Sequence, residues 1–267
     1  MSKIRIAHEA PKSIFNEVEK YTDYSYALVH LFEEDEEYLN QFKQAALKGR
    51  EIILDNSIFE LEEAFDAQKF DKWVNELKPT WYIVPDALED VDKTCNQMED
   101  WINKGLGYEG SGKIGVVQGK TYDEIVDCYN YMNKSADVDM IAISFDYSYY
   151  TQSVPHANKY VSWCLGRVKL LGDLLRDGVI NTDKPHHLLG SSLYWEGQFY
   201  KHSDYDWIYS MDTSNPVVFG IKDREYEGLT FDKPSQKLFT LINEDLSSDQ
   251  VSKVIKNIKD FRKAWNK

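Results

Sequence analysis

The sequence has few cysteines for its 267 residues. Cys95, Cys128 and Cys164 are odd in number and widely separated, so they indicate neither a disulfide framework nor a thiolate zinc cluster. A reducing compartment suits such a chain best. We therefore expect a cytoplasmic protein.

Long apolar runs are also lacking. No window approaches the ~20 uninterrupted apolar residues that a membrane-spanning helix needs, and the N-terminal Met1-Ser2-Lys3-Ile4-Arg5 is not followed by the apolar segment of a signal peptide. No Pro-, Gly- or Ser-rich linker interrupts the chain, and its apolar fraction of 42% is enough for a substantial core. We expect no membrane partner and a single domain over residues 1–267.

Positive charge is in deficit. Forty-five acidic residues against thirty-one basic ones give a formal charge of −14. This charge argues against non-specific electrostatic binding of nucleic acid over the whole surface. A local basic patch stays compatible with this balance. The main basic region consists of Lys113, Lys120, Lys159, Arg167, Lys169 and Arg176. For these residues we favour solvated helix faces over a track that follows phosphates.

The sequence does contain a regular alternation of apolar runs and amphipathic stretches. Eight runs are typical of strands: 4–8, 24–32, 52–54, 81–84, 113–117, 138–143, 186–189 and 207–212. Helical spacing occupies 13–20, 36–48, 65–77, 91–106, 122–132, 159–176, 195–201 and 248–265, and a polar, aromatic loop is expected at 149–156. This alternation predicts an α/β protein, a single (β/α)8 TIM barrel with a C-terminal helix.

Polar residues follow most of the predicted strands. The strand ends read Asp55-Asn56-Ser57, Pro85-Asp86, Gln118-Gly119, Ser144-Phe145-Asp146, Gly190-Ser191-Ser192 and Asp212-Thr213-Ser214. Active sites of TIM barrels lie at the carboxyl ends of the strands, and lysines that would grip a phosphate are missing from these positions. Carboxylates and an amide suit a neutral or weakly cationic polar ring, such as a nucleobase.

These segments resemble the tRNA-guanine transglycosylase family, including its relatives that insert 7-deazaguanines into phage and bacterial DNA. The resemblance covers about residues 51–215 and rests on short motifs in order. They are Leu54-Asp55-Asn56-Ser57, Val84-Pro85-Asp86, Gly115-Val116-Val117-Gln118-Gly119, Leu188-Leu189-Gly190-Ser191 and Met211-Asp212. The Gly-Val-Val-Gln-Gly and Leu-Leu-Gly segments are the more specific ones.

The resemblance implies a role for each matching position. Asp212 stands where the family has its nucleophile, which forms a covalent glycosyl intermediate, and Asp55 stands where the family has a general acid/base. The substrate-binding positions, which recognise the base edge or lie against the ring, are Asp86, Gln118, Gly119, Leu189, Gly190 and Ser191. We add Phe145 or Tyr149 as a side chain that stacks on a base.

The chain also departs from the family. The clustered cysteines and histidine that bind zinc in the family are absent here, Asn56-Ser57 replaces a glycine pair, and Thr213-Ser214-Asn215-Pro216 replaces an arginine-containing segment. We expect no structural zinc, no other metal and no cofactor. The differences favour a smaller, virus-encoded relative that acts on DNA or a free nucleoside rather than on tRNA, with a free 7-deazaguanine as the second substrate.

Each candidate residue also has a simpler interpretation. Asp55 and Asp86 could be helix N-caps after strands, and Gln118-Gly119 could belong to a turn. His186-His187 has no further ligand at helical spacing, so we interpret the pair as polar residues that open a strand rather than as a metal site. Asp212 is hardest to explain in this way, because it ends an apolar strand with no basic partner near it in sequence.

Three functions remain open. The first is a transglycosylase that replaces guanine by a 7-deazaguanine through Asp212. The second is a nucleobase glycosidase, in which water takes the place of the incoming base and the same residues act. The third is a non-catalytic barrel that binds a nucleotide or a protein.

Overall fold

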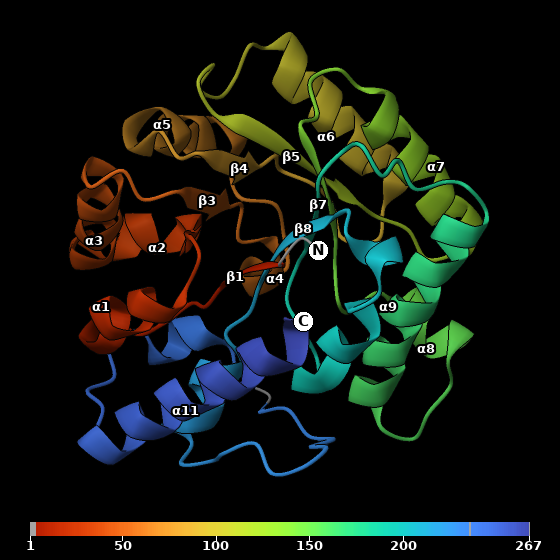
Figure 1. The fold of residues 1–267 in the computed structure, drawn as a ribbon. Coiled ribbons are helices and arrows are strands. Elements are labelled where there is room, and N and C mark those ends of the chain that lie inside the picture. Colours follow the sequence, from red (N-terminus) through yellow and green to blue (C-terminus); the bar gives the residue numbers. More distant parts are fainter. Residues whose placement is uncertain (1–3, 235, 267) are drawn as a thin grey trace. The chain divides into compact units, whose positions relative to one another are not determined.

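The computed structural model describes residues 4–234 and 236–266 and has the predicted α/β fold, a (β/α)8 barrel of the TIM type. In these residues eight strands form one sheet in the order β1-β8-β7-β6-β5-β4-β3-β2, so the first strand pairs with the last. Strands and helices alternate along the chain (Figure 1). The strands are β1 (Arg5–Ala7), β2 (Ser25–Leu28), β3 (Ile52–Asp55), β4 (Trp81–Ile83), β5 (Gly112–Val117), β6 (Met140–Ile143), β7 (His186–Leu188) and β8 (Ile208–Asp212).

The α-helices vary from single turns to five turns. They are α1 (Phe15–Val18), α2 (Val29–Glu34), α3 (Glu36–Leu47), α4 (Ile58–Leu61), α5 (Ala67–Leu77), α6 (Val91–Asn103), α7 (Tyr122–Lys134), α8 (Ser148–Ser153), α9 (Lys159–Arg176), α10 (Asn215–Ile221) and α11 (Ser248–Trp265). Short 3-10 helices complete the chain: η1 (Lys12–Ile14), η2 (Glu19–Tyr21), η3 (Tyr194–Tyr200), η4 (Ser203–Tyr205) and η5 (Leu238–Leu241).

Local signals in the sequence explain most of these boundaries. The predicted ends of α9 and α11 agree with the structure, because side chains of Asn158 and Ser247 accept hydrogen bonds from the first turn of each helix. Ser247 and Gln250 also form a capping box. The predicted helix over 195–201 is the 3-10 helix η3, one residue earlier.

Two predictions of local structure were wrong. The run 24–32 is not one strand, because β2 ends at Leu28 and the chain turns into α2. Every residue from 24 to 32 is buried, and a fully buried run has no period that separates strand from helix. The loop expected over 149–156 contains α8. The short helices α4 and α10 were also not expected.

The chain divides into two compact units, described separately below. The first unit contains the described residues up to Asp23, Ser144–Gly178 and the described residues from His187 onward. The second unit contains Tyr24–Ile143 and Val179–His186. Our prediction of one domain over 1–267 stays a prediction.

In the first unit, β1 and β8 pair in parallel and α10 packs against α11. The buried apolar side chains of this region come from the N-terminal helices, α10, η5 and α11: Ala10, Ile14, Val18, Val217, Val218, Ile221, Leu238, Leu241, Val254 and Ile258. Pro216 stands in the first turn of α10, where its missing N–H costs no helical hydrogen bond. The packing fixes the segment that leaves β8, directly after Asp212.

In the second unit, strands β2 to β6 pair in parallel with their neighbours. Helices α5 and α6 contribute Phe70 and Trp101, whose rings contact Tyr82 of β4 at centroid distances of 6.1 and 5.8 Å. Because the pairing is parallel, β3, β4 and β5 end at the same edge of the sheet. The polar residues that follow these strands are therefore close together.

Candidate functional site

Asp212 is the last residue of β8 and is 5% exposed. It lies opposite Ala7 of β1, and the N–H of Thr213 donates to the carbonyl of Ala7 at 3.1 Å. The predicted end of the strand is therefore confirmed. The carboxylate stands at the carboxyl end of a buried parallel strand, where this fold places functional groups.

Asp212 has a basic partner that sequence reasoning missed. Nε2 of His187, the middle residue of β7, lies 3.0 Å from Oδ1 of Asp212. The backbone N–H of Gly190 donates to the same oxygen at 3.3 Å. His187 is completely buried, so its contact with the carboxylate is shielded from solvent. His186 and His187 both belong to β7, in agreement with our interpretation of the pair as strand residues, and His187 in addition contacts Asp212.

The two oxygens of Asp212 differ in their surroundings. Both contacts named above go to Oδ1. Among residues 4–234 and 236–266, no hydrogen bond reaches Oδ2. The carboxylate is therefore held in a defined orientation through Oδ1.

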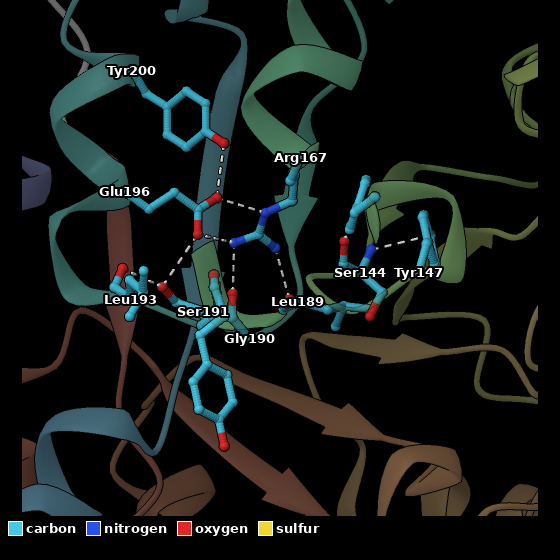
Figure 2. A network of polar contacts seen from close by, with 12 residues as sticks. Ser144, Tyr147, Arg167, Leu189, Gly190, Ser191, Leu193, Glu196 and Tyr200 are labelled. Atoms are coloured by element: carbon cyan, nitrogen blue, oxygen red, sulfur yellow. Dashed lines mark hydrogen bonds and ion pairs between the residues drawn. The ribbon is translucent and has the colours of Figure 1, made fainter. Parts of the chain in front are cut away.

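The loop after β7 is held by a buried ion pair (Figure 2). Nη1 and Nη2 of Arg167 in α9 donate to the carbonyls of Leu189 and Gly190 at 2.8 and 2.9 Å. The same guanidinium binds Glu196 of η3 in a bidentate manner, at 2.7 Å from Nε to Oε1 and 3.1 Å from Nη2 to Oε2. Thus α9 fixes the backbone from which Gly190 contacts Asp212.

Further hydrogen bonds complete the environment of Glu196. The hydroxyl of Tyr200 donates to Oε1 at 2.8 Å, and that of Ser191 reaches Oε2 at 3.4 Å (Figure 2). Burial acts to lower the pKa of Arg167, but Glu196 outweighs it and the pKa is raised above its ordinary value. The guanidinium therefore stays charged. As a charged donor it binds the two carbonyls and the carboxylate of Glu196 more strongly than a neutral donor would.

Gly190 occupies a position where any side chain would be strained. Its φ is +60°, and a Cβ at this position would lie 2.5 Å from Cδ1 of Phe145. The resemblance implied a residue whose side chain does not intrude on a bound ring. In the structure the ring of Phe145 occupies the space beside Gly190. Contact between Gly190 and a base stays a prediction.

The two residues expected to stack on a base differ in exposure. Phe145 is buried, with its ring edge-on to Trp163 at 5.6 Å and with Nζ of Lys233 at 4.1 Å from its centroid. Tyr149 lies in α8, is half-buried, and contacts the ring of Tyr150 at 6.3 Å. Tyr149 is therefore the more accessible of the two.

Lys233 is a second residue that sequence reasoning missed. It is half-buried over Phe145, and burial lowers its pKa to about 8 against the opposing effect of Asp146 and Glu9. Phe145 also lies against Gly190, which contacts Asp212. Asp212 is itself among the carboxylates that raise the pKa of Lys233, so this cation lies within electrostatic range of Asp212. The position of Lys233 far along the chain, after a loop, left no local signal for it.

The second unit contains a buried polar cluster formed by Asn56, Asp86 and Gln118. Nδ2 of Asn56 donates to Oδ1 of Asp86 at 2.7 Å, and Nε2 of Gln118 donates to Oδ2 at 2.6 Å. Oε1 of Gln118 accepts from the N–H of Glu89 at 2.8 Å. The structure therefore brings the predicted residues Asp86 and Gln118 into contact. It adds Asn56, which we had noted only as a departure from the family.

Burial raises the pKa of Asp86 to about 6, and the hydrogen bonds from Asn56 and Gln118 oppose this rise. At neutral pH the group is mainly a carboxylate. A carboxylate has about four acceptor positions, and the two amides occupy two of them.

Asp55 ends β3 and accepts hydrogen bonds from the segment that follows it and from the neighbouring strand β2. Its Oδ1 accepts from the N–H of Ser57 at 2.5 Å, and its Oδ2 accepts from the hydroxyl of Tyr26. The alternative of a helix N-cap is wrong for both predicted carboxylates, because Ser57 precedes α4 and Asp90 caps α6. The expected acid/base role of Asp55, and its expected placement opposite Asp212, stay predictions.

Gly119 follows Gln118 at the end of β5. A Cβ at Gly119 would lie 2.8 Å from the backbone nitrogen of Ile125 in the first turn of α7. Close approach of this helix explains the glycine without a ligand. The turn interpretation of Gln118-Gly119 stays a prediction, and the side chain of Gln118 reaches Asp86.

The basic region of the sequence is not a continuous group of free charges. Arg167 is buried against Glu196, as described above. Lys169 and Arg176 both pair with Asp173. The preference for helix faces over a phosphate track therefore holds for Lys169 and Arg176, while Arg167 belongs to the core.

In residues 4–234 and 236–266, no group of three or more His, Cys, Asp or Glu side chains is arranged to hold a metal ion. In the same part of the chain, no helix combines the length and apolar character needed to cross a bilayer. Comparison of the sequence with models of known protein families and with curated proteins finds no match.

Proposed function

We propose that this protein is a nucleobase-exchanging glycosyltransferase that replaces guanine in nucleic acid, DNA rather than tRNA, by a 7-deazaguanine. The observation that carries the proposal is the environment of Asp212. Its Oδ1 is held by His187 and by the N–H of Gly190, and Oδ2 is left for attack. Such an arrangement suits a carboxylate nucleophile, which must present one oxygen in a fixed direction.

The reaction has two displacement steps. In the first, Oδ2 of Asp212 bonds to the anomeric carbon, the bond from that carbon to N9 of guanine breaks, and N9 takes the electron pair and a proton. In the second, the incoming 7-deazaguanine loses a proton from the corresponding ring nitrogen, which bonds to the anomeric carbon and releases the carboxylate. Asp55 is the proposed proton donor and acceptor, by its resemblance to the family's acid/base residue.

Base recognition is assigned to the cluster around Asp86. A guanine or 7-deazaguanine ring presents adjacent N–H donors, which suit the acceptor positions of Asp86 that Asn56 and Gln118 leave open. Both ends of the Gln118 amide are already bonded, so its role is to orient Asp86. Lys233 supplies a cation for a phosphate of the nucleic acid.

The test is base exchange in purified components. The protein is incubated with guanine-containing DNA or tRNA and a labelled 7-deazaguanine, and nucleosides are identified by mass spectrometry. Incorporation by the wild-type chain and none by Asp212→Asn is expected. The control is Asp204→Asn, which removes an exposed carboxylate of η4 in the same unit and should keep full activity.

The other two functions give different results in the same experiment. Release of guanine without exchange, and with no added base, would show a glycosidase. Tight binding of a base with no turnover on DNA, tRNA or nucleosides would show a non-catalytic barrel. Incorporation retained by Asp212→Asn would exclude Asp212 as the nucleophile.

A further inference from the structure

Three side chains of the first unit form a continuous hydrogen-bonded row. Nδ1 of His187 lies 2.8 Å from Oγ of Ser210, and Nε2 lies 3.0 Å from Oδ1 of Asp212. Ser210 and Asp212 are two residues apart in β8, so their side chains lie on the same face of the strand. His187 in β7 bridges them. Ser210 and His187 are completely buried.

The partners determine which nitrogen of the imidazole carries the proton. An ionised carboxylate can only accept, so the hydrogen between His187 and Asp212 belongs to Nε2. In a neutral ring Nδ1 is then an acceptor, and the hydroxyl of Ser210 can donate to it. Asp212 therefore selects the tautomer with the hydrogen on Nε2, and the hydroxyl of Ser210 satisfies Nδ1 of that tautomer.

From this geometry we infer that His187 is a positioning residue for the nucleophile: as the Nε2–H tautomer, with Nδ1 bonded to Ser210, it orients Asp212 and stabilises this carboxylate when it leaves the sugar. The inference rests on the proposed function. His187 acts through Asp212 and contacts no substrate atom. Ser210 is fully buried, so it is not itself a nucleophile.

The role differs between the two chemical steps. When Oδ2 forms the ester, Oδ1 becomes a carbonyl oxygen and loses most of its negative charge, so its hydrogen bonds weaken. When the incoming base displaces Asp212, charge returns to Oδ1 and the bonds from His187 and Gly190 strengthen. A donor aimed at developing charge lowers the barrier of the step in which that charge appears. His187 should therefore matter most for the second step.

The experiment separates this role from mere packing. We compare His187→Phe, which removes the donor, with His187→Gln, whose amide can donate near the position of Nε2, and with Ser210→Ala. The control is His186→Gln, because His186 is also fully buried in β7 but points to the other face, where Nε2 contacts the hydroxyl of Tyr129 at 2.9 Å. Base incorporation and the covalent protein–DNA adduct are both measured, with thermal unfolding of each variant alongside.

We expect His187→Phe to lower kcat on the order of 100-fold and to accumulate adduct, with little change in KM for the base. His187→Gln should recover most of the activity, Ser210→Ala should lose roughly 2- to 10-fold, the value of about one hydrogen bond, and His186→Gln should resemble wild type. If His187→Phe and His186→Gln lose stability equally and show the same ratio of adduct to product as wild type, His187 is only a packing residue and the inference is wrong.

A second measurement does not depend on turnover. In protein labelled with 15N-histidine, the ring nitrogens of His187 should report the Nε2–H tautomer in wild type and a shift of the tautomer balance in Ser210→Ala. A Nδ1–H tautomer in wild type would overturn the inference whatever the activity. Absence of both adduct and incorporation in wild type would instead reject the proposed function, so the two failures are distinguishable.

Discussion

Arg167 of α9 and Glu196 of η3 form a bidentate ion pair in which both side chains are completely inaccessible to solvent. Two charges in the interior carry a large desolvation cost, which a well-packed apolar pair would avoid. Here the pair has a specific task, because Arg167 also binds the carbonyls of Leu189 and Gly190 (Figure 2). It fixes the loop whose N–H contacts Asp212.

Removing one member of this pair should be costly. We expect Arg167→Met to lower the free energy of unfolding by about 3–5 kcal/mol, because it leaves Glu196 as a buried, unpaired charge and frees two carbonyls. Urea titration measures the loss. The control is Arg176→Met near the end of the same helix, whose ion pairs are exposed and whose removal should leave stability unchanged. Equal effects of the two substitutions would contradict a structural role for the buried pair.

Gly190→Ala should impair both stability and activity. A Cβ there would clash with Phe145 and would sit on a backbone with φ of +60°, so the loop must move and its N–H leaves Oδ1 of Asp212. The matched control is Gly178→Ala, which has a φ of +68° but no atom within 4 Å of the added Cβ. Gly178→Ala should lower the free energy of unfolding only by the cost of an alanine in this left-handed conformation, about 1 kcal/mol. Calorimetry and the base-exchange assay test both variants, and similar melting temperatures would refute the clash.

Asp86 should make stability depend on pH. Its pKa in the folded protein is about 6 because of burial, whereas in the unfolded chain it is about 3.9. As the pH rises from about 3 to about 7, the unfolded state loses this proton first. The contribution of Asp86 to the free energy of unfolding therefore falls by roughly 3 kcal/mol in total and is level above about pH 7. The difference between wild type and Asp86→Asn, measured by urea unfolding from pH 4 to 7, isolates this contribution. Parallel curves for the two proteins would show that Asp86 does not titrate in this range.

Lys233 should contribute to affinity for DNA and not for the free base. A lysine on a phosphate contributes by release of counterions, so Lys233→Met should weaken binding of DNA and reduce the slope of log Kd against log salt by about 1. Lys222→Met is the control, because Lys222 is an exposed residue of the same unit and the same charge is removed. Fluorescence anisotropy at several salt concentrations measures both. An unchanged slope would show that Lys233 contacts no phosphate.

The sequence determined the alternation of strands and helices and the positions where the strands end. These features depend on local patterns: apolar runs, helical spacing and side chains that cap a first turn, as at Asn158 and Ser247. For that reason Asp212, Asp86 and Gln118 were predicted at the ends of strands, where the structure has them. The same local reasoning failed for 24–32, where every residue from Tyr24 to Phe32 is buried and burial alone does not distinguish strand from helix.

Only the tertiary structure decided the partners of these residues. His187 is 25 residues from Asp212 in sequence, Asn56 is 30 residues from Asp86, and Arg167 is 29 residues from Glu196. Each pair depends on which elements are neighbours and on where each side chain points, and spacing along the chain encodes neither. Burial then sets the charge states, as with the raised pKa of Asp86. The sequence thus located the carboxylates, and the fold determined which groups hold and orient them.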